Sequence, residues 1–301
     1  MNDLVTRDHL QNKIPISVEN GIGVVLYGKE SSDEHHDQTI TILKGYFNKI
    51  DVIRVSLEPI GDPVFNTLTI QDPGGIDDGS PGGFNFNRIL SQVQQGTQNV
   101  SGRYLLIMRA DLALTSGRFV TAQRRALGTE ASFKERVVTT SIYFKTRHFN
   151  KGFRKWIPAT MHPSDWIWFG LREDVERLFK GLEPLPEESA ISNSCPNHDF
   201  NPYRGIYNFR FPSEMLFGMN LIGADRKHCF LDYDRTDRKT WLNFCRDNFV
   251  ILPAKQFSFK KTTVGHQKAI SKPLIEPTML FATTNSRRLE LLRILNKIIR
   301  S

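Results

Sequence analysis

Apolar and polar positions follow two different periods along the first part of the chain. Residues 21–29 form an apolar run bounded by glycines, which is typical of a buried β-strand, and residues 51–59 predict a second strand. Between them, residues 38–50 place apolar side chains three and four positions apart, which predicts a helix. Residues 66–74 alternate and stop at Pro-Gly, which predicts a third strand. This β-α-β-β order is the beginning of an open, mostly parallel sheet.

The same patterns continue to the end of the chain. Residues 84–100 predict a helix with Asn85 or Asn87 near its N-cap and Arg88 in its first turn, followed directly by a buried strand from Tyr104 to Met108. We expect further helices at 119–127, after Gly170 through Phe179, at 212–223 with Ser213 as the cap, and from 240, and strands at 135–144 and before 254. The stretches 31–37 and 145–156 are expected to be loops, with the paired histidines of the first one solvated. The pattern therefore indicates an α/β fold.

An arginine and an aspartate follow the buried strand at Tyr104–Met108. Arg109 and Asp111 lie two positions apart, so on a strand they point to the same side. The carboxyl ends of strands in α/β sheets face the ligand crevice. There the guanidinium suits a phosphate, and the carboxylate suits a divalent cation or a sugar hydroxyl. The alternative is an ion pair that only closes the strand end, and the sequence does not separate the two interpretations.

Composition adds a basic balance to this picture. The 301 residues carry a net charge of +8, which favours anionic partners such as nucleic acid, phosphorylated small molecules or an acidic membrane surface. The three cysteines have no C-x-x-C spacing and indicate a reducing compartment with ordinary thiols. We find neither a secretory signal nor a membrane-spanning run. We divide the chain into a lead-in (1–16), one catalytic domain (17–254) and a basic C-terminal extension (255–301).

Three segments resemble the WavE lipopolysaccharide synthesis family, which is similar to GT-A glycosyltransferases. They are "NFNRIL" with "YLLIMRADLALTSGRF", then "HPSDWIWFGLREDVERLF", and more weakly the first strand "VVLYGK". The resemblance spans roughly residues 22–220. It implies a GT-A-like three-layer sandwich and a hexosyltransferase-like enzyme that moves a sugar from a nucleotide-sugar donor to a glycan or lipid-linked acceptor of a bacterial surface polysaccharide. Such an enzyme is expected in the cytoplasm, at the inner membrane.

The resemblance also bears on the donor site. GT-A enzymes hold a divalent metal on the donor diphosphate with an Asp-x-Asp motif at a strand end, whereas this chain has Arg109-Ala110-Asp111. One carboxylate is missing, so the use of Mn²⁺ or Mg²⁺ through Asp111 is in doubt. Cations must then share in stabilising the nucleoside diphosphate that leaves. We expect the donor to be held by Asn87, Arg88, Arg109 and Asp111, with help from the basic stretch that contains Arg147 and Arg154.

An inverting transfer also needs a base for the acceptor hydroxyl. Asp165 is the first candidate, since it lies in a polar cluster between apolar residues, where partial burial raises the pKa of a carboxyl group. Glu214 is the second. The alternatives are that Ser164 or Asp165 caps the next element and that Glu214 is an ordinary first-turn acid. We expect acceptor contacts from His162, Trp166, Arg147 and Arg154, although tryptophans such as Trp166 are more often core residues.

Two other functions compete with the transferase. A non-enzymatic nucleic-acid-binding protein would explain the charge, but the chain has no recognised nucleic-acid-binding signature, so no nucleic acid partner is expected. A degenerate transferase fold retained as a binding protein would explain the single Asp111. The cationic amphipathic stretch 285–301 suits a peripheral membrane contact, or ordinary packing on the domain.

Overall fold

A computed structural model describes most of the central part of the chain. The described residues are 20–28, 33–60, 66–77, 84–123, 126, 133–141, 145–150, 155–191, 211–225, 234–252, 257 and 260–261. Side chains are described for these residues except 33–35, 145–150, 155–160 and 260–261.

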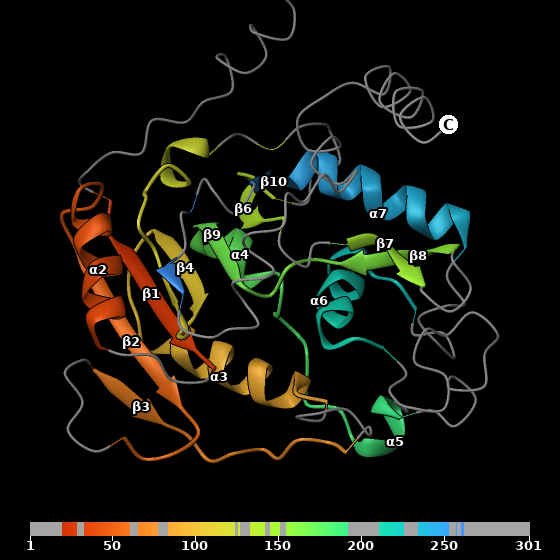
Figure 1. Ribbon diagram of the computed structural model, residues 1–301, viewed down its shortest axis with the longest axis horizontal. Coiled ribbons are helices and arrows are strands. Elements are labelled where there is room, and N and C mark those ends of the chain that lie inside the picture. Colours follow the sequence, from red (N-terminus) through yellow and green to blue (C-terminus); the bar gives the residue numbers. More distant parts are fainter. Residues whose placement is uncertain are drawn as a thin grey trace, which may run out of the picture.

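A seven-stranded sheet forms the centre of the protein (Figure 1). Its strands in chain order are β1 (Ile22–Tyr27), β2 (Ile50–Ser56), β3 (Thr67–Thr69), β4 (Tyr104–Arg109), β6 (Val137–Thr140), β9 (Ile167–Leu171) and β10 (Phe249–Leu252). Their spatial order is β10-β6-β9-β4-β1-β2-β3. All neighbouring pairs are parallel except the two that β9 forms with β4 and β6, so β9 runs against the rest of the sheet.

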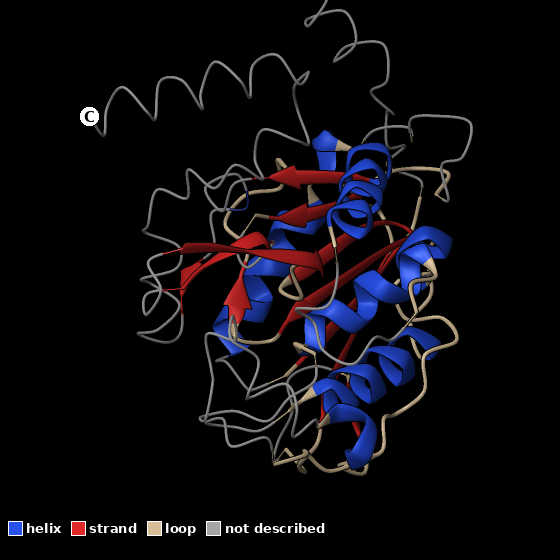
Figure 2. Ribbon diagram, turned by 90° about the vertical axis from the view of Figure 1, so that its right-hand side faces the viewer, coloured by secondary structure: helices blue, strands red, loops and turns tan. Residues whose placement is uncertain are grey.

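The central strands are apolar because both faces of the sheet are covered by other elements. Every residue of β1 is buried, and so is every residue of β4 before Arg109. One face packs on α3 (Phe86–Gln98), α4 (Arg172–Glu176), α5 (Glu187–Ala190), α6 (Ser213–Ile222) and α7 (Arg235–Asn248). The other face packs on α2 (Asp33–Lys44) and the 3₁₀-helix η1 (Val120–Ala122). Figure 2 shows helices lying alongside the strands.

Two small sheets complete the described fold. β5 (Leu112–Ala113) pairs antiparallel with β11 (Lys260–Lys261), and β7 (Lys145–Asn150) pairs antiparallel with β8 (Lys155–His162). The second pair is a hairpin whose β8 strand packs on α6 and α7. The stretch 145–156 was expected to be a loop, and this expectation is wrong, because residues 145–150 and 155–156 belong to the two paired strands.

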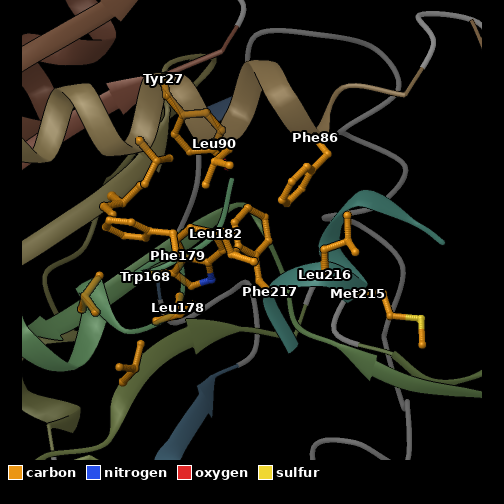
Figure 3. Packing of buried hydrophobic residues seen from close by; sticks show 14 of the residues in the cluster. Tyr27, Phe86, Leu90, Trp168, Leu178, Phe179, Leu182, Met215, Leu216 and Phe217 are labelled. Atoms are coloured by element: carbon orange, nitrogen blue, oxygen red, sulfur yellow. The ribbon is translucent and has the colours of Figure 1, made fainter. Parts of the chain in front are cut away.

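Aromatic rings hold α6 against the sheet. The ring of Phe217 in α6 lies 5.2 Å from the Trp168 ring of β9 and 5.5 Å from the Phe86 ring of α3, measured between centroids. Figure 3 shows these rings lying together with Leu90 and Tyr27 around them. Large apolar side chains of this kind supply most of the free energy that holds such elements in place. The beginning of α6 is therefore fixed relative to β9.

The predicted mixed α/β architecture with a mostly parallel sheet is confirmed, while several element boundaries differ. α2 begins at Asp33, so residues predicted as a polar loop are its first turns. The helix predicted at 119–127 is described only as the three-residue η1, and the one after Gly170 ends at Glu176. Pro212, not Ser213, occupies the N-cap of α6. The expected helix at 285–301 lies outside the described residues, and the division into 1–16, 17–254 and 255–301 stays a prediction.

Candidate functional site

The order of the strands reverses at the boundary between β1 and β4. Along the chain, β1, β2 and β3 extend to one side, and β4 then returns to the other side of β1. Open α/β sheets bind ligands at such a reversal, outside the carboxyl ends of the strands. Here the two strand ends are Tyr27 and Arg109, which are register partners. The backbone N–H of Ala110 donates to Tyr27 O at 2.7 Å and joins the ends.

The segment before β9 lies beside these two strand ends. Because β9 is antiparallel to β4, it begins at the edge where β4 ends. The backbone N–H of Arg109 donates to Trp166 O at 3.1 Å. The Tyr27 hydroxyl donates to the backbone carbonyl of Asp165. Residues from three strands are thus tied together at the reversal.

Arg109 and Asp111 form an ion pair at this edge. Arg109 Nε donates to Asp111 Oδ1 at 2.9 Å, and Arg109 Nη2 donates to Asp111 Oδ2 at 2.8 Å. The Arg109 side chain is 27% exposed and that of Asp111 is 6% exposed. The ion-pair alternative is therefore present in the structure. The pair uses the N–H of Nε and one N–H of Nη2. The second N–H of Nη2 and the two N–H groups of Nη1 are not used by Asp111, so this edge of the guanidinium could bind a phosphate while the ion pair stays intact.

Glu214 reaches the same edge from the first turn of α6. Its Oε2 lies 3.8 Å from Nε2 of His162, a buried residue at the end of β8. Gly218, one turn further along α6, makes this approach possible. A Cβ atom at Gly218 would lie 2.2 Å from the Met161 carbonyl oxygen, so only glycine fits there. Met161 itself has a φ of 57°, an uncommon conformation for a residue other than glycine.

The charges around Asp165 change its proton affinity. Burial of the carboxyl group and the negative charge of Glu214 raise the pKa of Asp165 to about 7, against the opposing charge of Arg109. Asp165 is 5% exposed. The expected rise in the pKa of this carboxyl group is therefore what the structure gives. A carboxyl group of this kind exchanges a proton near neutral pH, as general acid–base catalysis requires.

Two other groups of this cluster are also perturbed. Burial, together with the charge of Asp165, raises the pKa of the Tyr27 hydroxyl well above its usual value, so Tyr27 stays a neutral donor. Burial disfavours the charged form of Arg109, but its hydrogen bond to Asp111 and the charges of Asp165 and Asp111 outweigh burial and raise its pKa. Arg109 is therefore a permanent cation inside an otherwise acidic cluster.

The described residues do not fit a divalent metal at this place. Both carboxylate oxygens of Asp111 accept hydrogen bonds from Arg109, so a metal ion at Asp111 would have to share this single carboxylate with a cation. Within the described part of the chain, no group of three His, Cys, Asp or Glu side chains is arranged to hold a metal ion. Mn²⁺ and Mg²⁺ prefer several oxygen ligands, so we derive no step through a metal.

Asn87 and Arg88, expected to bind the donor, are placed at the beginning of α3. Asn87 is 7% exposed, and its amide group both donates to Leu185 O and accepts from Leu185 N, each at 2.8 Å. Arg88 donates to both carboxylate oxygens of Asp72, at 2.7 to 3.1 Å. Since α3 leads into β4, its beginning lies at the same edge of the sheet as Arg109, but both side chains are engaged in contacts within the chain.

The four residues expected to contact the acceptor differ in their burial and in how far the structure describes them. Trp166 is 1% exposed, which agrees with the alternative that it is a core residue. Its ring lies beneath the Arg109 guanidinium, with 5.8 Å between Arg109 Cζ and the ring centroid, and supports that cation. His162 is buried beside Glu214. Arg147 is described only by its backbone in β7, and Arg154 lies outside the described residues.

Sequence reasoning missed three contributors to the site. Tyr27 was read only as part of a buried strand. A tyrosine at the end of a buried strand indicates a hydroxyl that needs a hydrogen-bond partner there. Gly218 was hidden inside a helical pattern. His36, expected to be solvated, is fully buried in α2, with Nε2 at 3.2 Å from Ala110 O. It is buried because α2 begins earlier than predicted and covers the residues that follow β4.

Comparison with known protein families identifies a family for this chain. Residues 66–269 match the model of the family described as WavE lipopolysaccharide synthesis. This range contains Arg109, Asp111, Asp165 and Glu214, and thus most of the site. No curated protein matches the chain. Among the described helices, none is long and apolar enough to cross a bilayer.

Proposed function

We propose that this chain, which belongs to the WavE lipopolysaccharide synthesis family, is a glycosyltransferase with a GT-A-like fold. It would transfer a sugar from a nucleotide-sugar donor to a glycan or lipid-linked acceptor. Membership of the family indicates a role in lipopolysaccharide synthesis. The observation that carries the proposal is Asp165, a buried carboxyl group with a pKa of about 7 at the strand reversal of an α/β sheet.

In an inverting transfer, Asp165 acts as the base. Its ionised carboxylate accepts the proton of the acceptor hydroxyl while the acceptor oxygen bonds to the anomeric carbon and the bond to the donor phosphate breaks. The negative charge of Glu214 raises the proton affinity of Asp165, which makes it a stronger base than an exposed aspartate. Tyr27 holds the backbone of Asp165 in place through its hydroxyl. In this proposal Glu214 sets the pKa of the base and is not a second base.

Arg109 supports departure of the nucleotide. The negative charge that grows on the leaving phosphate needs a fixed cation close to it. Arg109 stays charged, is 27% exposed, and lies on the Trp166 ring, which limits its movement. Asp111 orients the guanidinium through two hydrogen bonds. We therefore assign Asp111 to positioning Arg109.

A location at the membrane follows from the acceptor. Lipid-linked acceptors lie at the inner face of the membrane, and residues 285–301 combine apolar side chains with five arginines and lysines. We propose a cytoplasmic enzyme that contacts the inner membrane peripherally through this stretch.

Thermal unfolding with nucleotides gives the first test. A ligand that binds the folded state raises the melting temperature according to its concentration and dissociation constant. We expect one of UDP, CMP, GDP and dTDP to do so, without a requirement for Mn²⁺. The corresponding nucleotide sugars are then offered with a glycan acceptor to the wild type and to Asp165→Asn.

We expect Asp165→Asn to reduce the transfer rate by about 100-fold or more while nucleotide binding is retained. Nucleotide binding without transfer by the wild type would instead support a binding protein with a degenerate transferase fold. Stabilisation by a random oligonucleotide at low salt, with no response to any nucleotide, would contradict the proposal and favour nucleic-acid binding.

A further inference from the structure

Two hydrogen bonds from α2 hold the segment that follows β4. Nε2 of His36 lies 3.2 Å from the Ala110 carbonyl oxygen, and the backbone N–H of Leu114 donates to Thr39 Oγ1 at 3.1 Å. Both side chains belong to the buried side of α2, where His36 is 0% exposed and Thr39 is 1% exposed. The helix therefore reaches the residues just beyond Arg109 through two placed polar groups.

A histidine is an unusual residue for this position of α2. The buried positions of the helix recur three and four residues apart, at His36, Thr39 and Leu43, and such a stripe ordinarily carries apolar side chains. An imidazole placed there loses its hydration, which costs free energy unless it is hydrogen-bonded. Because a carbonyl oxygen only accepts, Nε2 of His36 carries the proton and donates to Ala110. This hydrogen bond is a reason for a histidine that apolar packing does not supply.

The hydrogen bond from His36 fixes the peptide group between Ala110 and Asp111. On the other side of Ala110, its own N–H donates to Tyr27 O at 2.7 Å, which fixes the peptide group between Arg109 and Ala110. β1 and α2 thus each hold one of the two peptide groups that join Arg109 to Asp111. Because the backbone between two residues sets the relative direction of their side chains, both hydrogen bonds determine how Arg109 and Asp111 face each other.

The ion pair between Arg109 and Asp111 depends on this backbone. Its hydrogen bonds, at 2.9 and 2.8 Å, form because the guanidinium and the carboxylate face each other edge to edge. Asp111 is 4% exposed, so its closely packed carboxylate has little room to compensate for a displaced backbone. A rotation of the peptide group after Ala110 therefore reaches Arg109 through Asp111.

We propose that His36 is a positioning residue for Arg109: by holding the Ala110 carbonyl it keeps Asp111 facing the guanidinium, and so keeps the N–H groups that Asp111 does not use directed to the leaving phosphate. The part of this inference that concerns the phosphate rests on the proposed function, whereas the positioning of Arg109 is measurable without any ligand. Thr39, one turn further along α2, holds the backbone beyond the ion pair and does not position Arg109.

The test follows the Nε–H proton of Arg109 by NMR. This proton is donated to Asp111, so it exchanges slowly with solvent while the ion pair is formed. Its signal is identified by its absence from Arg109→Gln. The wild type is compared with His36→Leu, which is apolar and has no donor, and with His36→Gln, which presents an amide N–H in place of Nε2. Thr39→Val is the matched control, since it removes a buried hydrogen bond of the same helix to the same segment.

We expect exchange of the Arg109 proton to be faster by about tenfold or more in His36→Leu, because the peptide group after Ala110 is then free to rotate and the ion pair opens. His36→Gln should restore slow exchange, and Thr39→Val should leave it unchanged. The melting temperature of each variant shows whether it is folded, and His36→Ala replaces His36→Leu if the latter does not fold.

Transfer kinetics give a second readout. If Arg109 acts on the leaving phosphate, His36→Leu should lower kcat by about tenfold with little change in KM. In a protein that already carries Arg109→Gln, His36→Leu should lower kcat no further, because the residue through which it acts is gone. A residue that only stabilises the fold would have the same effect in both backgrounds.

The outcomes separate this inference from the proposed function. Unchanged exchange of the Arg109 proton in His36→Leu, or equal acceleration in Thr39→Val, would overturn the positioning role even if sugar transfer is found. An equal fall of kcat with and without Arg109→Gln would overturn it as well. Selective acceleration in His36→Leu supports the positioning of Arg109 even if the wild type transfers no sugar, and only the proposed function then fails.

Discussion

At Asp165, opposing effects meet on one carboxyl group. Burial and the charge of Glu214 favour the protonated form, whereas Arg109 and a hydrogen bond from the backbone favour the carboxylate. The resulting pKa of about 7 lies well above that of an exposed aspartate. The folded state therefore holds a proton on Asp165 at acidic pH values at which the unfolded chain has released it.

This pKa predicts that stability and activity depend on pH in opposite directions. Because the folded state binds the extra proton, the free energy of unfolding falls as the pH rises from about 4 to about 7. Transfer needs the carboxylate, so the rate rises with pH around a midpoint near 7. Thermal unfolding and initial rates across the range measure both. Asp165→Asn should lose this part of the pH dependence of stability, and an unchanged dependence would contradict the assignment.

Tyr27 provides a second test at the scale of a single residue. Tyr27→Phe removes the donor to the Asp165 carbonyl and leaves that buried oxygen unsatisfied. We expect a loss of about 1–3 kcal/mol in the free energy of unfolding, together with a lower kcat at unchanged nucleotide affinity. Urea unfolding and steady-state kinetics measure these. Tyr46→Phe, at a half-buried tyrosine after α2, is the matched control, and an equal effect of the two changes would contradict a specific role for Tyr27.

At the scale of elements, α6 brings Glu214 to Asp165 because Gly218 lets the helix contact the Met161 backbone. Ring contacts of Phe217 with Phe86 and Trp168 hold the same helix against α3 and β9 (Figure 3). The distance from α6 to the start of β9 is thus set by one glycine and one aromatic cluster, and the electrostatic effect of Glu214 depends on it.

Gly218→Ala should move α6 away from Met161. The added Cβ would lie 2.2 Å from a backbone oxygen that has little freedom to move, so we expect a cost of about 1–3 kcal/mol in the free energy of unfolding. As Glu214 retreats, the pKa of Asp165 falls and the midpoint of the pH–rate profile moves to lower pH. Gly45→Ala is the control, since its Cβ would have only an ordinary contact at 3.4 Å. A destabilised variant with an unmoved midpoint would contradict the role of Glu214.

Asn87 tests whether the beginning of α3 serves structure or the donor. Its amide satisfies both backbone groups of Leu185. Asn87→Ala should therefore cost about 1–3 kcal/mol in the free energy of unfolding and leave the affinity for the nucleotide unchanged once the protein is folded. Asn99→Ala, at the exposed end of the same helix, is the control. A selective loss of nucleotide affinity would restore the predicted donor role of Asn87.

The sequence predicted the central strands better than the contacts at the candidate site. β1 and β4 are apolar runs, and burial on both faces makes such runs recognisable in the sequence. The proximity of Asp165 to Arg109 depends on β9 running antiparallel to β4, which no local pattern encodes. Likewise, 145–156 was read as a loop because its alternation is interrupted by charged residues, and only pairing between β7 and β8 shows the strands.

At the scale of the whole molecule, charge is distributed unevenly along the chain. Residues 253–301 contain ten lysines and arginines against two glutamates, which equals the entire net charge of +8. The remainder of the chain is balanced, in agreement with ion pairs such as Arg88–Asp72 and Arg172–Glu176. Attraction to anionic surfaces or ligands is thus concentrated in the last sixth of the sequence.

This distribution predicts binding to anionic lipid vesicles through the C-terminus. Neutralising Arg293, Lys297 and Arg300 with glutamine should weaken binding to phosphatidylglycerol vesicles by about 100-fold, since each such charge contributes about 1 kcal/mol. Co-sedimentation at two salt concentrations measures this. The control replaces the exposed Lys44, Lys180 and Lys239. Equal losses in the two triple variants would show that only net charge matters and would contradict a membrane-contacting C-terminal stretch.

The reversed strand β9 also has a consequence for the order in which the protein is assembled. Chains are synthesised and begin to fold from the N-terminus. β1, β2, β3 and β4 can pair with one another early, but β6 and β10 reach them only through β9. Until residues 167–171 are inserted, β6 is separate from β1 to β4 and Arg109 has no Trp166 beneath it. Inserting β9 joins these strands and brings Asp165 to Arg109 in one event, and Glu214 follows with α6, so a nascent chain acquires the shifted pKa of Asp165 only after the sheet has become continuous through β9.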